Sequence, residues 1–357
     1  MREAVFEFEL LTPAILAGAN QQCAEMRIPS IRGALRWWTR LIYGEEKEKR
    51  IFGHVTGKIC QPSTVSLRLL SSATPGVKNS QNATSITGNK FDYFLWPLEQ
   101  NEGQNKRGIL LANTRFKVAL KVKNGCDEID EDILWSFILC GSLGTRSRRA
   151  YGSIWPVSVT IDGKERKIPQ TIDNFLDRTD RFFENVDVSI YTLSEGEKDY
   201  KAAINVCSSF LKTLRCGKNQ YGAAASKWGK NDHDAGLEKE DQIYRAALGL
   251  PLVQKYSGNN KRTVEYSIVG WDRLASPLHF KIIKLKNRFV PILLVIPEYA
   301  PKDGTVLRAK VKNGRDFMVK LDNDLLNFLI GAYERDTKKL KNIFPSVKQI
   351  AYYAAEE

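Results

Sequence analysis

The order of short alternating segments and longer apolar ones over the first 163 residues constrains the fold most strongly. Residues 2–11 interleave apolar side chains with three glutamates, the period-2 pattern of a strand. Helices are predicted at 30–43, with Ser30 as N-cap and Gly44 as C-cap, and at 130–140. Further strands are predicted at 65–70, 91–95, 116–123 and 153–161, with a polar loop over 71–90. With 91–95 as an additional strand, the order is β-α-β-β-α-β, the ferredoxin-like arrangement of two helices on one face of an antiparallel sheet.

The second half of the chain is less regular. Residues 278–285 and 289–296 are rich in Ile, Val and Leu and predict a hairpin that is buried on at least one face. The glycine-rich stretch 219–236 predicts a flexible insertion. Helices are predicted at 172–186, 197–214, 240–248 and 322–335. The charged segment 163–167 and Pro169 indicate a boundary, so we predict an N-terminal domain over 1–163 and a C-terminal domain over 164–357.

A surplus of positive charge and a glycine-rich arginine loop point to a polyanionic partner. The net charge is +13 and the pI is about 9.3. In the segment 141–152, Arg146, Arg148 and Arg149 lie among glycines with no acidic residue to neutralise them. Exposed N–H groups and guanidinium forks bind phosphate. The alternative is a turn that carries arginines by chance, but three uncompensated arginines repel one another unless an anion is bound.

The helix over 30–43 carries a second set of arginines. At about 100° per residue, Ile31, Leu35, Trp38 and Ile42 form its core face. On the adjacent stripe lie Arg32, Arg36 and Arg40, and on the far side lie Gly33 and Trp37. These arginines are either a solvated surface or a second part of a binding site. A helical glycine costs about 1 kcal/mol relative to alanine, so Gly33 suggests that a ligand approaches closely, and Trp37 could stack on a base.

Other residues offer little catalytic chemistry. His54 is either the general base of a metal-independent ribonuclease or a packing residue, and His279 reads as structural. The six cysteines form no CxxC pair, which argues against a metal site and for reduced thiols. The N-terminus lacks the pattern of a signal peptide and no apolar run of about 18 residues occurs, so we predict a cytoplasmic protein without membrane contact.

The segments 27–38, 51–53, 144–152 and 273–279 together resemble the RAMP superfamily of CRISPR proteins. They are most similar to the first RAMP subunit of the Cmr-type (type III-B) effector complex. Ala150 departs from the family pattern, where a glycine is usual. The resemblance implies an α+β protein of two ferredoxin-like (RRM-like) domains, the second divergent with extra helices. It also implies that the chain has no catalytic site of its own. No cofactor and no metal are expected.

The resemblance further implies that the chain contacts CRISPR guide RNA and target RNA near the guide 3′ end, beside other Cmr effector subunits that cut. An endoribonuclease that processes CRISPR transcripts through His54 is the alternative, and a stand-alone basic structural protein is a third. We expect Arg36, Arg40 and 146–149 to line one groove, with Gly33 and Gly144 leaving room for the RNA backbone. The candidate RNA-binding residues are Arg32, Gly33, Arg36, Trp37, Arg40, Gly144, Arg146, Ser147, Arg148, Arg149, Tyr151 and Arg273.

Overall fold

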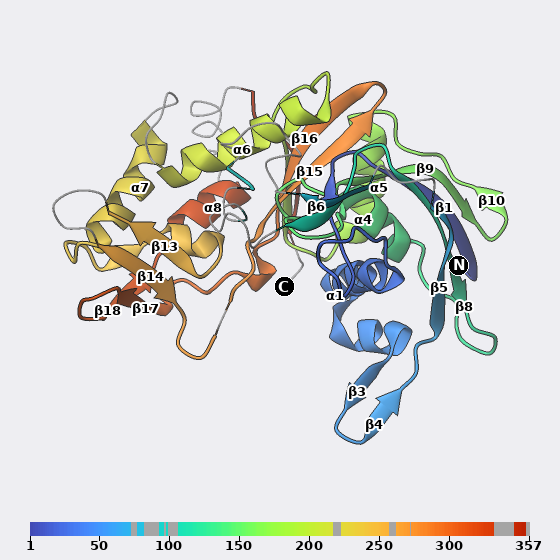
Figure 1. Ribbon diagram of the computed structural model, residues 1–357, viewed down its shortest axis with the longest axis horizontal. Coiled ribbons are helices and arrows are strands. Elements are labelled where there is room, and N and C mark those ends of the chain that lie inside the picture. Colours follow the sequence, from blue (N-terminus) through green and yellow to red (C-terminus); the bar gives the residue numbers. More distant parts are fainter. Residues whose placement is uncertain are drawn as a thin grey trace.

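The computed structural model shows two lobes joined along a central hairpin (Figure 1). It describes residues 1–72, 77–81, 93–95, 98, 106–216, 223–256, 262–271, 273–331 and 346–354.

The N-terminal lobe is built on a five-stranded antiparallel sheet in the order β10-β9-β1-β8-β5. Its strands are β1 (Glu3–Leu10), β5 (Val65–Ser72), β8 (Arg115–Val122), β9 (Ile154–Ile161) and β10 (Lys164–Glu165). In β1 the side chains of Ala4, Phe6 and Phe8 are fully buried, as the alternation predicts. Helices α1 (Ile28–Phe52) and α4 (Asp132–Cys140) contact each other on the side of the sheet that faces the second lobe (Figure 1).

Helix α1 differs from its prediction at both ends. It begins at Ile28, so Ser30 lies inside the first turn and is not the N-cap. The reason is Pro29, whose fixed φ and missing N–H suit the start of a helix. Gly44 interrupts the helix with φ 82°, but a second helical segment continues to Phe52 and ends at Gly53. The predicted end was therefore a kink, which turns the final segment back toward the first.

Two predictions in the first half are wrong where the structure describes them. Residues 93–95 form a turn and not a strand, with Phe94 and Leu95 buried, while 91–92 lie outside the described residues. Within the predicted loop 71–90, residues Val77–Gln81 form β6. This strand pairs with β7 (Arg107–Leu110), which pairs with β2 (Ala14–Ile15). Long-range pairing overrides the polar composition here.

The second lobe contains a four-stranded antiparallel sheet in the order β15-β16-β11-β19. Its strands are β11 (Val188–Thr192), β15 (Leu278–Leu285), β16 (Arg288–Val295) and β19 (Lys348–Tyr353). The predicted hairpin is confirmed, with Lys286 and Asn287 as its two-residue turn. Helices α5 (Ile172–Phe183) and α6 (Tyr200–Cys216) confirm the predictions for 172–186 and 197–214.

A second five-stranded sheet, in the order β12-β18-β17-β14-β13, forms the far end of this lobe (Figure 1). Its strands are β12 (Gln242–Ile243), β13 (Leu252–Lys255), β14 (Thr263–Ser267), β17 (Val306–Val311) and β18 (Phe317–Leu321). The helix predicted at 240–248 is wrong, because the segment holds β12 and a 3-10 turn, Arg245–Leu248.

Two further segments of this lobe also depart from their predictions. Within the predicted flexible insertion, 223–235 form helix α7 (Ala223–Ala235). Its Trp228 is buried against Phe328 and donates to Asp324, a fixed packing that polar composition hides. Helix α8 (Asp324–Ile330) ends at Gly331, and the remainder of the predicted helix 322–335 lies outside the described residues.

Candidate nucleic-acid interface

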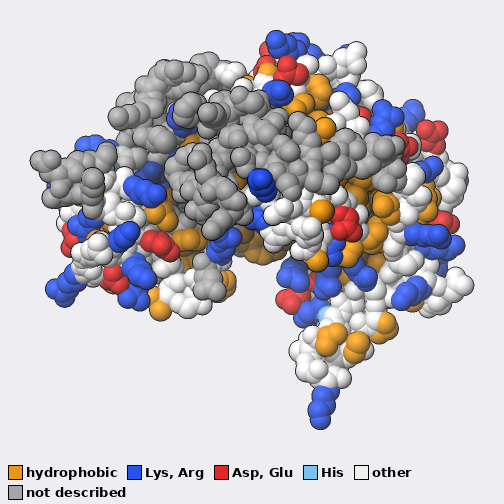
Figure 2. Space-filling model, viewed as in Figure 1, with side chains coloured by type: hydrophobic (Ala, Val, Ile, Leu, Met, Phe, Trp, Pro, Cys, Tyr) orange, Lys and Arg blue, Asp and Glu red, His pale blue; other side chains and the backbone are white. Residues whose placement is uncertain are grey.

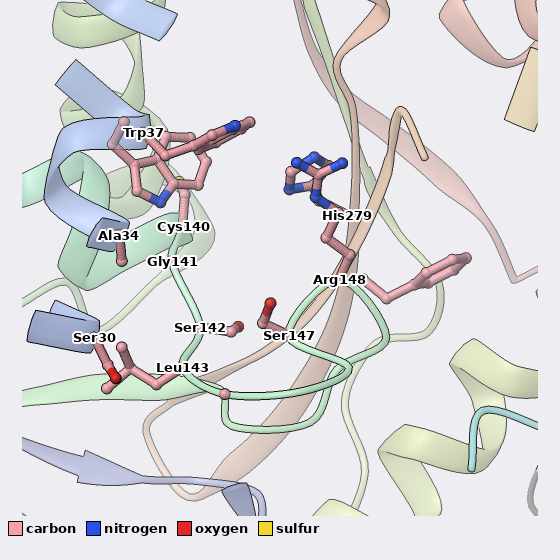
Figure 3. A pocket seen from close by; sticks show the side chains of 13 residues that line it. Ser30, Ala34, Trp37, Cys140, Gly141, Ser142, Leu143, Ser147, Arg148 and His279 are labelled. Carbon is pink, nitrogen blue, oxygen red and sulfur yellow. The ribbon is translucent and has the colours of Figure 1, made fainter. Parts of the chain in front are cut away.

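A cavity of about 250 Å³ lies where α1, the glycine loop 141–152 and strand β15 meet (Figure 3). The two arginine-rich segments therefore do converge in space, with β15 as a third wall. The described residues that line it are Ser30, Ala34, Trp37, Trp38, Cys140, Gly141, Ser142, Leu143, Gly144, Ser147, Arg148, His279 and Phe280. Lys and Arg side chains lie on both sides of the recess that opens between the lobes in Figure 2.

Helix α1 presents Ser30, Ala34 and Trp37 to the cavity, since these positions share one helical face. The Trp37 ring stacks on the imidazole of His279, with centroids 5.0 Å apart and planes at 29°. The Arg148 guanidinium lies 5.3 Å from the Trp37 ring centroid. Trp37 was considered as a stacking surface for a base off the core face, but it is half-buried because the second lobe covers that face of the helix.

His279 is part of this wall, a role that its place in a strand did not indicate. Its side chain is buried, and burial together with the charges of Arg148 and Arg149 holds the pKa of the imidazole well below its usual value. The ring is therefore neutral near pH 7.

The glycines of the loop serve the chain's own packing. Gly144 has φ 87°, and a Cβ there would lie 2.5 Å from the carbonyl oxygen of Ile15. The neighbouring Thr145 N–H donates to that oxygen at 2.9 Å. We expected Gly144 to leave room for RNA, but what it admits is strand β2. Ala150, at the position where the family pattern has glycine, also adopts a left-handed conformation, with φ 62°.

Arg148 and Arg149 bind the loop to the second lobe. Arg148 Nη1 donates to the Ser276 carbonyl at 2.9 Å, and Arg149 Nη1 donates to the Leu278 carbonyl at 3.0 Å. The backbone joins in, because Ala150 N–H donates to the Phe280 carbonyl at 3.0 Å. Burial lowers the pKa of Arg149 to about 9, and neighbouring arginines add to the effect, so the side chain remains charged near neutral pH.

Arg146 is held differently. Its φ is 67°, and its Nε is buried without a hydrogen-bond partner among the described residues. Burial lowers the pKa of Arg146, as do the charges of Arg273 and Arg215. Arg215, in the last turn of α6, was missed by the sequence analysis because no local motif surrounds it. Within the part of the chain that the structure describes, no ion pair to a carboxylate involves Arg146, Arg148 or Arg149.

The arginines of α1 do not line the cavity. Glu48, which is fully buried, accepts from Arg36 Nε and, at 2.9 Å, from Arg40 Nη2. Arg32 Nη2 donates to the Phe52 carbonyl at 3.0 Å. The kink at Gly44 thus supplies a carboxylate that the sequence order did not reveal. The expected single groove is present only in part, because Arg148 and Gly144 line the cavity whereas Arg36 and Arg40 are bound to Glu48.

The remaining candidate residues lie at different places relative to the cavity. Ser147 lines the cavity, while Gly33 is exposed on α1 with open space around it. Tyr151 is fully buried in the core. Arg273 is exposed on the segment that leads to β15. His54 lies in β3 (His54–Thr56) of a short hairpin with β4 (Ile59–Gln61) and does not line the cavity.

Two kinds of feature are absent from the described residues. None of their helices has the length and apolar character needed to cross a membrane. In the same residues, no cluster of three or more His, Cys, Asp and Glu is arranged to hold a metal ion.

Comparison with known proteins gives consistent matches. Residues 7–155 match the RAMP superfamily. The CRISPR system Cmr subunit Cmr1-1 of Pyrococcus furiosus is 26% identical over 304 residues, which cover 79% of this chain and 84% of that protein. Subunit Cmr1-2 of the same organism is 28% identical over 184 residues, 43% of this chain and 95% of that protein. The crystal structure of apo Cmr1 from Pyrococcus furiosus has a TM-score of 0.54 at 17% identity and covers 100% of both chains, so the two share a mixed α+β fold.

Proposed function

We propose that this chain is a non-catalytic RNA-binding subunit of a type III-B (Cmr) CRISPR effector complex. The premise is that it is a RAMP superfamily protein that resembles Cmr1. In this role it contacts guide and target RNA near the guide 3′ end, captures target RNA and leaves cutting to other Cmr subunits. One observation carries the proposal: a cavity walled by an aromatic helix face and by a cationic loop that lacks carboxylate partners among the described residues.

We infer that each lobe is a ferredoxin-like unit. Numbered along the chain, the long strands of the first sheet lie in the order fourth, first, third, second, as β9-β1-β8-β5. The strands β19-β11-β16-β15 repeat that order in the second sheet. The distal sheet is then an insertion that makes the second unit divergent. The division into domains 1–163 and 164–357 stays a prediction, and β10 extends the first sheet just beyond it.

The chemistry of the cavity favours binding over catalysis. General acid–base cleavage of RNA needs two titratable groups at one phosphodiester. Among the described residues that line the cavity, His279 is the sole histidine, and none is a carboxylate. Arg148 and the loop offer charge to a phosphate, and Trp37 offers an aromatic wall to a base. Cationic and aromatic side chains together are the combination that binds single-stranded RNA.

The test is single-stranded RNA binding by the purified chain in EDTA at several salt concentrations. Ser147→Glu places a negative charge at the cavity wall, and Ser66→Glu adds the same charge on the exposed edge strand β5 as a control. We expect Ser147→Glu to weaken RNA binding by about tenfold, which corresponds to the free energy of one charged contact. Ser66→Glu should change the affinity little. Thermal melting checks that both variants fold.

Two results would contradict the proposal. Equal affinities for the two variants would place RNA away from the cavity. Cleavage of CRISPR repeat RNA in EDTA, lost in His54→Ala, would favour the processing endoribonuclease.

A further inference from the structure

We propose that Arg146, Arg215 and Arg273 form a phosphate subsite outside the cavity, to which both lobes contribute and which binds the backbone of the same RNA strand. This inference rests on the proposed function and deepens it. It predicts that RNA crosses from the glycine loop onto the second lobe.

The three arginines come from separate segments. Arg146 lies in the glycine loop, Arg215 in the last turn of α6, and Arg273 on the segment between the turn at Gly270 and strand β15. The charges of Arg273 and Arg215 act on Arg146 and lower the pKa of its guanidinium beyond the effect of burial. Arg215 and Arg146 act in the same way on Arg149. The contacts between these segments agree. Arg148 of the loop donates to the Ser276 carbonyl at 2.9 Å, three residues after Arg273, and the ring of Phe210 in α6 lies 6.2 Å from that of Phe280 in β15.

Two donors in this cluster are unused. The Nε atoms of Arg146 and Arg215 are buried and have no hydrogen-bond partner within the described ranges. A buried guanidinium N–H without an acceptor costs about 1–3 kcal/mol, and neighbouring like charges add to the cost. A phosphate bound by the outer N–H groups of these guanidiniums offsets the like-charge repulsion.

The nearby buried carboxylate does not compensate the cluster, because it is already satisfied. Asp232 accepts from the side chain of Arg245, from Tyr244 N–H at 2.7 Å and from Arg245 N–H at 3.1 Å. Arg245 in turn donates to the carbonyl of Arg215 and so anchors the end of α6. Asp232 is therefore paired with Arg245. Arg215 has no counterion of its own among the described residues.

The backbone at Arg146 supports a ligand role. A long side chain in the left-handed region is uncommon, and such strain persists where the surroundings fix it. Here the turn is fixed by Arg149 N–H, which donates to the Arg146 carbonyl at 2.7 Å. The strained backbone therefore fixes the position from which the Arg146 side chain leaves the loop.

Phosphate is the anion that this geometry favours. Guanidinium groups that approach from three segments match the several oxygens of a phosphodiester. Ser147 and Arg148, which line the cavity, follow Arg146 directly in the chain. A strand with one nucleotide in the cavity therefore has its backbone within reach of the cluster. An acidic protein segment is the competing occupant.

The experiment compares Arg215→Gln with Lys212→Gln, which removes the same charge from an exposed position of the same helix. We expect Arg215→Gln to weaken single-stranded RNA binding by about tenfold and to flatten the log–log salt dependence by about 0.7. Lys212→Gln should change affinity less than twofold. In Arg146→Gln, the further effect of Arg215→Gln should shrink, since both contact one phosphate.

The outcomes separate this subsite from the proposed function. Equal binding by Arg215→Gln and Lys212→Gln, alongside a loss in Ser147→Glu, would overturn the subsite and leave RNA binding at the cavity. Wild-type protein that binds no RNA would overturn both. Competition by oligoglutamate as strong as that by RNA of equal charge would assign the cluster to an acidic protein segment. Arg215→Lys, which keeps the charge, should retain most of the salt dependence if the variant is folded and the subsite is real.

Discussion

Gly33 and Gly144 lie in the two arginine-rich segments, but the structure requires only one of them. Gly144 admits the Ile15 carbonyl at a positive φ, so the fold itself needs it. At Gly33 a Cβ would meet nothing within 4 Å, and its place in α1 is helical. A glycine that the fold does not need is free to serve a ligand. Gly33 does not line the cavity, but it is exposed and precedes Ala34, which does.

Replacing Gly33 by alanine separates stability from binding. The helix propensity gain predicts that Gly33→Ala is more stable by about 1 kcal/mol in its free energy of unfolding, measured by denaturant titration. If RNA approaches α1 closely, the same variant binds RNA more weakly, and Gly33→Glu binds more weakly still. A stabilised Gly33→Ala with wild-type RNA affinity would show that no ligand contacts this position.

The arginines show where residue types alone mislead. Arg146, Arg148 and Arg149 are equivalent in the sequence, yet Arg148 and Arg149 donate to carbonyls of the second lobe while Arg146 Nε has no partner among the described residues. This division depends on where β15 lies, about 130 residues further along the chain. No local pattern could separate the arginines that donate to the second lobe from the one whose Nε does not.

Single elements with strong periodicity were predictable. Strand β1, helix α4 and the β15–β16 hairpin are apolar in the expected period, and each was confirmed. The elements that the sequence did not predict depend on partners distant in the chain. Strand β6 is stabilised by pairing with β7, and α7 is held by the contact of its buried Trp228 with Phe328. In α1, Gly44 has the signature of a helix end, and only the packing shows that the helix resumes after a kink.

The kink at Gly44 places the carboxylate of Glu48 against Arg36 and Arg40 of the same helix. Replacing Glu48 should therefore cost more stability than replacing the exposed Glu46. Glu48→Gln should lower the free energy of unfolding by about 1–3 kcal/mol, because Arg36 and Arg40 lose a fully buried carboxylate. Glu46→Gln, whose side chain is 91% exposed beside Lys49, should stay within about 0.5 kcal/mol. Denaturant melts of both variants make the comparison, and equal losses would mean that the buried pairs contribute no more than the exposed one.

The same substitution tests the α1 arginines as RNA ligands. With the charge of Glu48 removed, Arg36 and Arg40 are free to contact phosphate, so folded Glu48→Gln should bind single-stranded RNA more tightly than Glu46→Gln at low salt. An unchanged affinity would remove these two arginines from the interface.

At the scale of the whole molecule, the two lobes are joined by polar groups that are buried between them. Lys281 of β15 donates to the carbonyls of Ile138, at 3.3 Å, and Gly141, at the C-terminal end of α4. Ile282 N–H donates to Ser153 Oγ at 3.1 Å. These contacts fix the cavity walls relative to each other, so the shape of the cavity depends on the association of the lobes.

Lys281 therefore gives that association a pH dependence. Burial lowers the pKa of Lys281 to about 7 from its ordinary 10.5. Between these values the unfolded chain binds a proton that the folded chain has released, so the free energy of unfolding rises with pH across this window. The slope from this group is at most about 1.4 kcal/mol per pH unit, and below about pH 7 its contribution is constant and unfavourable.

Lys281→Met should lose this slope between pH 7 and 8.5, whereas Lys310→Met, on the exposed face of β17, should keep it. The comparison of variants cancels the Cys140 thiol, whose pKa burial raises to about 12. Denaturant titrations at three pH values measure the slopes, and a wild-type slope in Lys281→Met would show that Lys281 is protonated throughout and that its charge is stabilised by the end of α4.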